Sequence, residues 1–197
     1  MESKVKLAGH PVHPMLVVFP LGLLATAVIF DVIYLISGNP PWPLVAYYLI
    51  GAGIIGGLVA AVFGWLDWIA IPSGTRAKSV GLWHGLLNVA VLTLFLLSWL
   101  LRRGNPELPP TGAVVAGLAG AAITVIAAWL GGELVNRLGV GVYDGAHLDS
   151  PSSLSELPAG AGLGTASRAG TSGSSGTDRR ASTPTAYTGS DRRSSLR

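Results

Sequence analysis

The residues of this sequence that could bind a metal or a cofactor are histidines at the edges of its apolar segments or inside them. His10 and His13, each followed by a proline, precede the first apolar segment. His84 lies within the third, one helical turn before Asn88. Imidazole can ligate haem iron or a transition metal, relay protons, or simply hydrogen-bond between helices. The sequence contains no cysteine, which excludes disulfides, iron–sulfur clusters and thiolate metal sites.

Two carboxylates, Asp67 and Glu133, are expected close to the same membrane face as these histidines. Asp67 either orients an imidazole ring or pairs with Arg76 or Lys78. Glu133 has the corresponding choice, with Arg137 four residues later as its surface partner. Ionisable groups at membrane depth are costly and usually face the interior of a bundle or water. The candidate metal or haem ligands are therefore His10, His13, His84, Asp67 and Glu133, with Asn88 supporting them.

Four nearly charge-free segments must position these residues, and each is long enough to cross a bilayer. Only 12% of all residues are charged, against about 25% in a typical soluble domain, and the mean hydropathy is +0.54. A helical span needs about 20 residues, and continuously apolar segments predict helices rather than barrel strands. Asp31, near the outer end of the first segment, is expected to cap that helix or to face the following loop. The spans are expected at about residues 14–36, 44–71, 79–101 and 111–132.

The connections and the C-terminal segment complete the predicted architecture. Short loops favour antiparallel neighbours, so we predict an all-α membrane protein, a four-transmembrane-helix up-down bundle over residues 1–147. Residues 148–197 are rich in Ser, Thr, Gly and Arg and are predicted to form a disordered cytoplasmic tail, because they hold too few apolar side chains to build a core. Lys and Arg favour the cytoplasmic side of short loops, which predicts that both termini are cytoplasmic. On that side would lie Lys4, Lys6, Arg76, Lys78 and Arg137, and on the other side Arg102 and Arg103.

Small residues are expected to let the helices approach closely in lipid, where hydrophobicity contributes little to helix association. The same residues could instead mediate contacts between copies of the chain. Pro20, inside the first span, cannot donate a backbone hydrogen bond and is expected to kink the helix. The predicted packing positions are Gly53, Gly57, Gly81, Gly85, Gly112 and Gly120.

Several motifs follow one another along the chain. They are His10-Pro11-Val12-His13-Pro14, Phe19-Pro20, Gly64-Trp65-Leu66-Asp67, Gly74-Thr75-Arg76-Ala77, Gly131-Gly132-Glu133-Leu134-Val135 and Gly139-Val140-Gly141-Val142. With Asp31, His84 and Asn88, they make residues 7–143 resemble the bacterial membrane family called domain of unknown function 2231. The resemblance implies a four-helix protein of the bacterial inner membrane without an assigned activity. Relatives fused to, or encoded with, c-type cytochrome or Rieske-type modules imply respiratory or redox partners, although Asn136 and Leu138 stand where relatives have Tyr and His.

Two hypotheses for the function follow, with a weaker third. The first is a redox- or metal-associated membrane protein. It binds b-type haem through His13 and His84, or a divalent metal such as zinc or iron through the three histidines of the cluster and one carboxylate. The second is a non-catalytic structural or assembly subunit, in which the cluster is a polar lock between helices. A small transporter is disfavoured because the polar residues gather at one end of the bundle and no internal repeat is evident.

Other classes of function find little support in the residues. No nucleophile–base arrangement or phosphate-binding loop predicts an enzyme. Lipid is the expected surrounding, a homo-oligomer is left open, and nucleic acid is not an expected partner because no folded basic domain is present.

Overall fold

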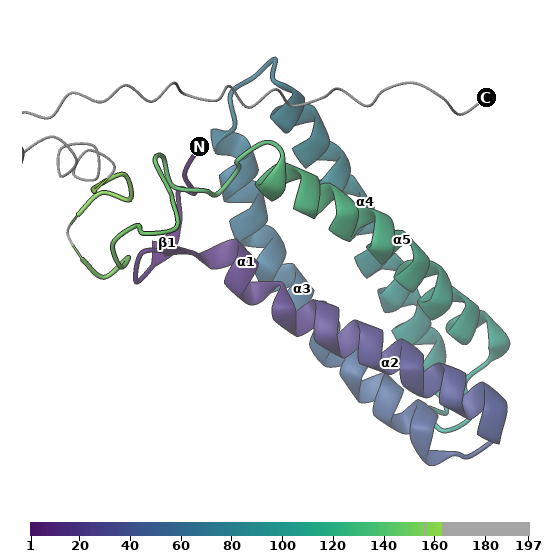
Figure 1. The fold of residues 1–197 in the computed structure, drawn as a ribbon. Coiled ribbons are helices and arrows are strands. Elements are labelled where there is room, and N and C mark those ends of the chain that lie inside the picture. Colours follow the sequence, from purple (N-terminus) through teal and green to yellow (C-terminus); the bar gives the residue numbers. More distant parts are fainter. Residues whose placement is uncertain (156, 163–197) are drawn as a thin grey trace, which may run out of the picture. The chain divides into compact units, whose positions relative to one another are not determined.

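The structure, a computed structural model, describes residues 1–155 and 157–162 of the chain, and within them five helices follow a short hairpin (Figure 1). The hairpin pairs strands β1 and β2. Four candidate spans are long and apolar enough to cross a membrane, the first of them made of α1 and α2 together, which confirms the predicted fold class. The elements are β1 (Lys6–Leu7), β2 (His10–Pro11), α1 (Val12–Leu16), α2 (Val18–Ser37), α3 (Pro41–Ala70), α4 (Arg76–Arg102) and α5 (Thr111–Asn136).

The helices pair as two antiparallel hairpins, α2 with α3 and α4 with α5 (Figure 1). Helix α3 also packs against α4, and α2 against α5, so each helix of the bundle has two neighbours. We call the end of the bundle that carries Met1 and residues 71–75 the terminal end. The opposite end, with the loops of residues 38–40 and 103–110, is the loop end. Met1 donates its amino group to the Gly139 carbonyl at 3.1 Å, which places the end of α5 beside the N-terminus.

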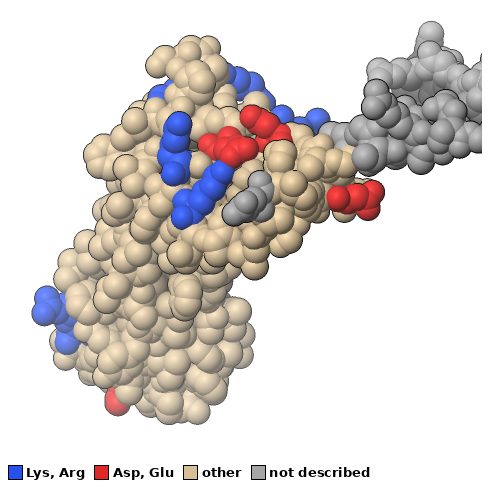
Figure 2. Space-filling model, turned by 90° about the vertical axis from the view of Figure 1, so that its left-hand side faces the viewer, with Lys and Arg blue, Asp and Glu red and all other residues tan. Residues whose placement is uncertain are grey.

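Apolar side chains occupy both the inside and the outside of the bundle, as expected of a protein surrounded by lipid. Leu24, Ile50 and Phe95 are buried between the helices. Trp129 and Ile36, by contrast, are 66% and 83% exposed. On the face that Figure 2 shows, charged side chains gather toward the two ends and leave an uncharged band between them. The surface therefore has the pattern of a membrane-spanning domain.

The helix boundaries follow from local residue chemistry. The Thr75 hydroxyl accepts a hydrogen bond from the Lys78 amide at 3.2 Å and caps the start of α4. Gly38 ends α2 in the left-handed conformation, with φ of 65°, which a residue without a Cβ adopts without strain. The first span is interrupted at Val17, three residues before Pro20. This interruption is the expected consequence of a proline that cannot donate to the preceding turn.

The predicted packing glycines fall into two groups. At Gly53, Gly57, Gly81 and Gly120, an added Cβ would lie 2.6 to 3.0 Å from a side chain of a neighbouring helix, so the absence of a side chain permits the close approach there. Next to Gly112 the nearest such atom is 4.0 Å away, and Gly85 has open space within that distance. These last two positions therefore do not contribute a tight contact within the chain.

The segment after α5 returns to the N-terminal hairpin. Residues 148–155 and 157–162, the part of the predicted tail that the structure describes, form turns and irregular segments. Ser153 lies against the hairpin and its hydroxyl donates to the Ala8 carbonyl at 3.4 Å. Residues 163–197, to which the prediction of a disordered tail also applies, lie outside the described residues.

Candidate functional site

His13 lies in the first turn of α1, and its side chain contacts α3. Its Nδ1 is 2.9 Å from the Ala60 carbonyl oxygen, and a Cβ added at Gly64 would lie 2.8 Å from the ring. The carbonyl can only accept a hydrogen bond, so Nδ1 carries the proton and donates it. In the neutral ring, Nε2 is then the unprotonated nitrogen, which is the form that ligates a metal.

His84 repeats this arrangement between α4 and α5. Its Nδ1 donates to the Ala127 carbonyl oxygen at 2.9 Å, and its ring packs on Gly131, where an added Cβ would lie 3.1 Å away. In both cases the glycine follows the accepting alanine by one helical turn. Asn88 donates to the His84 carbonyl at 2.8 Å, and its amide nitrogen is 3.3 Å from Nε2 of the ring. The expected contact between Asn88 and His84 is therefore present.

The two imidazoles belong to one neighbourhood of the terminal end. His13 contacts α3 and His84 contacts α5, each within its own hairpin. Both rings are partly buried and both have Nδ1 engaged with a backbone carbonyl. Each histidine therefore joins the two sides of its own hairpin and leaves Nε2 as the nitrogen that could ligate a metal.

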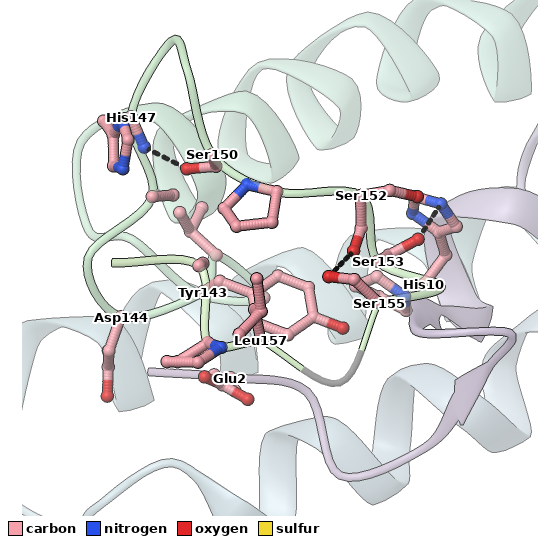
Figure 3. A pocket seen from close by; sticks show the side chains of 17 residues that line it. Glu2, His10, Tyr143, Asp144, His147, Ser150, Ser152, Ser153, Ser155 and Leu157 are labelled. Atoms are coloured by element: carbon pink, nitrogen blue, oxygen red, sulfur yellow. Dashed lines mark hydrogen bonds between the residues drawn. The ribbon is translucent and has the colours of Figure 1, made fainter. Parts of the chain in front are cut away.

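The other three candidate ligands lie elsewhere and have partners of their own. His10 belongs to β2, and its Nε2 lies 3.1 Å from the Ser153 hydroxyl (Figure 3). Asp67 accepts from the Ser3 hydroxyl at 2.6 Å and from the Lys4 amide at 3.0 Å. Within residues 1–155 and 157–162, no three His, Cys, Asp or Glu side chains are grouped to hold a metal ion. The structure therefore gives no support to the five-residue metal cluster.

The ion pairs expected for the two carboxylates are also wrong. Glu133 pairs with Arg76 at 2.7 Å instead of with Arg137, because the start of α4 lies beside the end of α5. Asp67 pairs with neither Arg76 nor Lys78, because the N-terminal segment folds back onto the end of α3 and supplies its donors. The Lys78 ammonium instead donates to the Trp68 carbonyl at 2.7 Å.

The Asp67 carboxylate is expected to anchor the N-terminal segment. Asp67→Ala removes the acceptor of two hydrogen bonds, each about 1.5–3 kcal/mol when it involves a charged group. Trypsin should then cleave after Lys4 several-fold faster, as measured by intact-protein mass spectrometry. The exposed Asp149 offers the matched control, Asp149→Ala. Equal cleavage rates in the two variants would contradict the anchoring role.

A surface hollow of about 680 Å³ lies between the N-terminal hairpin and residues 141–159 (Figure 3). It is lined by polar groups such as His10, His147 and Tyr143. The Tyr143 hydroxyl donates to the Gly9 carbonyl and ties the two segments together. In the N-terminal segment, Glu2 and Lys6 form an ion pair, which lowers the pKa of the glutamate and raises the pKa of the lysine. These contacts fold the terminal end without grouping catalytic side chains.

The loop end contains a buried ion pair that the sequence reasoning missed. Arg102 donates from its two terminal nitrogens to the two carboxylate oxygens of Asp31 at 2.7 and 2.6 Å. The two side chains are 0% and 1% exposed. Ser98 joins them, accepting from Arg102 Nε at 3.3 Å and donating to the Ala113 carbonyl at 2.6 Å. The expectation that Asp31 caps its helix or faces the loop is therefore wrong.

The sequence did hold a signal for this pair. Asp31 is the one acidic residue inside the first apolar segment, and Arg102 stands at the end of the third. A lone charge within an apolar helix requires a partner in the bundle. Only the tertiary structure, in which Asp31 of α2 reaches Arg102 of α4 across the bundle, identifies which partner is used.

The fold and the buried polar contacts define an integral membrane protein with four candidate spans. Residues 9–144 match the family model described as predicted membrane protein DUF2231, and the chain belongs to that family. This confirms the resemblance seen in the motifs. Neither the curated proteins nor the solved structures contain a match to the chain.

Proposed function

We propose that this chain is a redox-associated protein of the bacterial inner membrane in which His13 and His84 ligate a b-type haem. The observation that supports the proposal is the matched state of the two imidazoles. Each donates from Nδ1 to a backbone carbonyl of the second long helix of its hairpin, α3 or α5, and each rests on a glycine. A ligating histidine usually bonds its second ring nitrogen in this way, which fixes the tautomer and directs Nε2 to the metal.

The donor chemistry of the site fits two-imidazole ligation. Neutral imidazole is an axial ligand of haem iron, and a haem bound there would supply one-electron transfer. The proposal no longer includes His10, Asp67 and Glu133, because each has a different partner at the terminal end. It keeps redox membrane proteins as partners and both termini on the cytoplasmic side.

A second candidate function rests on the same hydrogen bonds. Under it, the chain is a non-catalytic structural or assembly subunit, and His13 and His84 are clamps between helices. The contact of the Asn88 amide with His84 Nε2 favours this alternative, because it occupies the nitrogen that a metal would need. Hydrogen bonds of this kind between membrane helices contribute about 0.6–1.7 kcal/mol each.

Optical spectra of the full chain purified in detergent test the proposal, with and without added haemin and before and after reduction. We expect a reducible Soret band from one haem per chain, lost in His13→Ala and in His84→Ala. The matched controls are His10→Ala and His147→Ala, which remove histidines outside the pair and should keep the band. Metal analysis of the same samples detects a bound metal ion that has no optical band.

The two functions predict different outcomes for the same variants. If the natural chain takes up neither haem nor metal, and His84→Ala only lowers its thermal stability, the redox proposal is wrong and the clamp is correct. If His10→Ala abolishes the band as completely as His84→Ala, the assignment of the ligand pair is wrong.

A further inference from the structure

We infer that the chain is a tandem repeat of one helical hairpin, and that Asp31 and Arg102 select the pairing of its two halves. The first half comprises α1, α2 and α3, and the second comprises α4 and α5. Residues of the first helix of each half correspond at a separation of 71 positions. Residues of the second helix correspond at 67, because the chain of the second hairpin is four residues shorter at the loop end, where shorter helices are joined by a longer loop.

The imidazole contacts provide the first evidence. His84 follows His13 by 71 residues, and the carbonyl that each contacts belongs to alanines 67 residues apart, Ala60 and Ala127. Gly64 and Gly131, on which the rings rest, are also 67 residues apart. The local sequences also match, because each consists of two alanines, two large apolar residues and a glycine, at residues 60–64 and 127–131.

A second contact, nearer the middle of the bundle, obeys the same two separations. Leu24 packs against Gly53, and Phe95 packs against Gly120. An added Cβ would lie 2.6 Å from the leucine and 3.0 Å from the phenylalanine. Leu24 and Phe95 differ by 71 positions and the two glycines by 67.

A third correspondence lies toward the loop end. Ala27 and Ser98 differ by 71 positions, and Ala46 and Ala113 by 67. All four are 0% exposed. Three separate layers of the bundle therefore share one alignment, although the sequence itself shows little identity between the halves.

This alignment makes Asp31 and Arg102 equivalent positions, since they too differ by 71. They contact each other directly. Equivalent residues of two related units touch only where the units meet at their two-fold axis. Helices α2 and α4 both run from the terminal end to the loop end, so the halves are parallel repeats whose axis follows the membrane normal. The contacts thus point to a repeat that is not evident in the sequence alone.

The opposite charges give this axis contact a selective role. Two related halves present similar surfaces. In two copies of the chain, a first half could therefore pair with another first half as well as with a second half. An Asp31–Asp31 or Arg102–Arg102 contact between like halves would bury two equal charges, which is strongly unfavourable in a bundle interior. Only the pairing of a first half with a second half buries a neutral pair. Buried polar and ionic groups select register or partner in some proteins.

Charge exchange in the full chain tests both parts of the inference. Asp31→Arg alone, or Arg102→Asp alone, should lower the unfolding midpoint in detergent by about 10 °C or abolish the monodisperse protein. The reciprocal double variant, D31R with R102D, should recover at least half of the lost midpoint, because the positions are equivalent. A double variant no more stable than the single ones would overturn the inference.

Moving the supporting serine from position 98 to position 27 provides a matched control. If the repeat exists, the direction of the shift in unfolding midpoint depends on where the arginine stands. Ser98 supports the guanidinium from the second half, and Ala27 is its counterpart in the first. The pair of changes A27S and S98A should lower the midpoint of the natural chain but raise that of the D31R/R102D variant. If these two changes shift both proteins in the same direction, positions 27 and 98 are not equivalent and the repeat is refuted.

Discussion

Arg102→Ala is expected to reduce the free energy of unfolding by about 3–5 kcal/mol. The substitution leaves the Asp31 carboxylate 1% exposed in its present site, without the two charge-assisted hydrogen bonds that it now accepts. Breaking a buried ion pair on one side carries this penalty because the remaining charge has lost both its partner and its water. Unfolding in mixed micelles of increasing SDS content, followed by tryptophan fluorescence, measures the change.

The neighbouring arginine serves as the control for this experiment. Arg103 is exposed and lies over the Trp99 ring, so Arg103→Ala should cost less than about 1 kcal/mol. Removing both buried charges together, as Asp31→Leu with Arg102→Met, should restore most of the stability, because apolar replacements of a buried pair are often neutral. A loss below about 1 kcal/mol for Arg102→Ala would show that water reaches the pair.

Gly64→Ala is expected to destabilise the chain by about 1–3 kcal/mol, the usual cost of overpacking. Its new methyl group would lie 2.8 Å from Cε1 of His13 and 3.0 Å from Nδ1, which forces a rigid ring away from α3. The displacement also lengthens the hydrogen bond from His13 to the Ala60 carbonyl. Under the haem proposal, the same variant shifts or abolishes the Soret band. Thermal unfolding and optical spectra of one preparation measure both effects.

Two comparisons isolate the contact between Gly64 and His13. Gly85→Ala adds the same methyl group where no atom lies within 4 Å, so it should be neutral or slightly stabilising. In the His13→Ala background, Gly64→Ala should cost little, because the clashing ring is gone and the two changes are coupled. If the losses of stability from Gly64→Ala and His13→Ala are additive, the cost of Gly64→Ala arises within α3 and not from the contact with His13.

Much of the fold was predictable because it depends on properties of single segments. Four apolar segments of sufficient length require four helices in a bilayer, whatever their neighbours are. The interruption before Pro20 and the cap at Thr75 follow from one residue and the turn beside it. The contact of Asn88 with His84 was likewise predictable, since residues four apart share a helix face.

The candidate site was less predictable, because its partners come from other helices. From the depth of its residues the sequence predicted one cluster at the terminal end, yet depth leaves the direction around each helix axis undetermined. In the structure, His13 and His84 turn toward the next helix of their own hairpins, whereas Asp67 faces the N-terminal segment and Glu133 faces Arg76. With His10 against Ser153, the expected cluster is therefore five separate contacts in the described residues.

By itself, then, the sequence determined that this protein spans a membrane with four helices and that its charged groups lie toward the ends. Hydropathy and length are summed along each segment, so they need no knowledge of the partner. The tertiary structure alone decided that Asp31 meets Arg102. It also showed that contacts in the two hairpins correspond. The halves are alike in the positions that contact each other, whereas few of their residue types are identical.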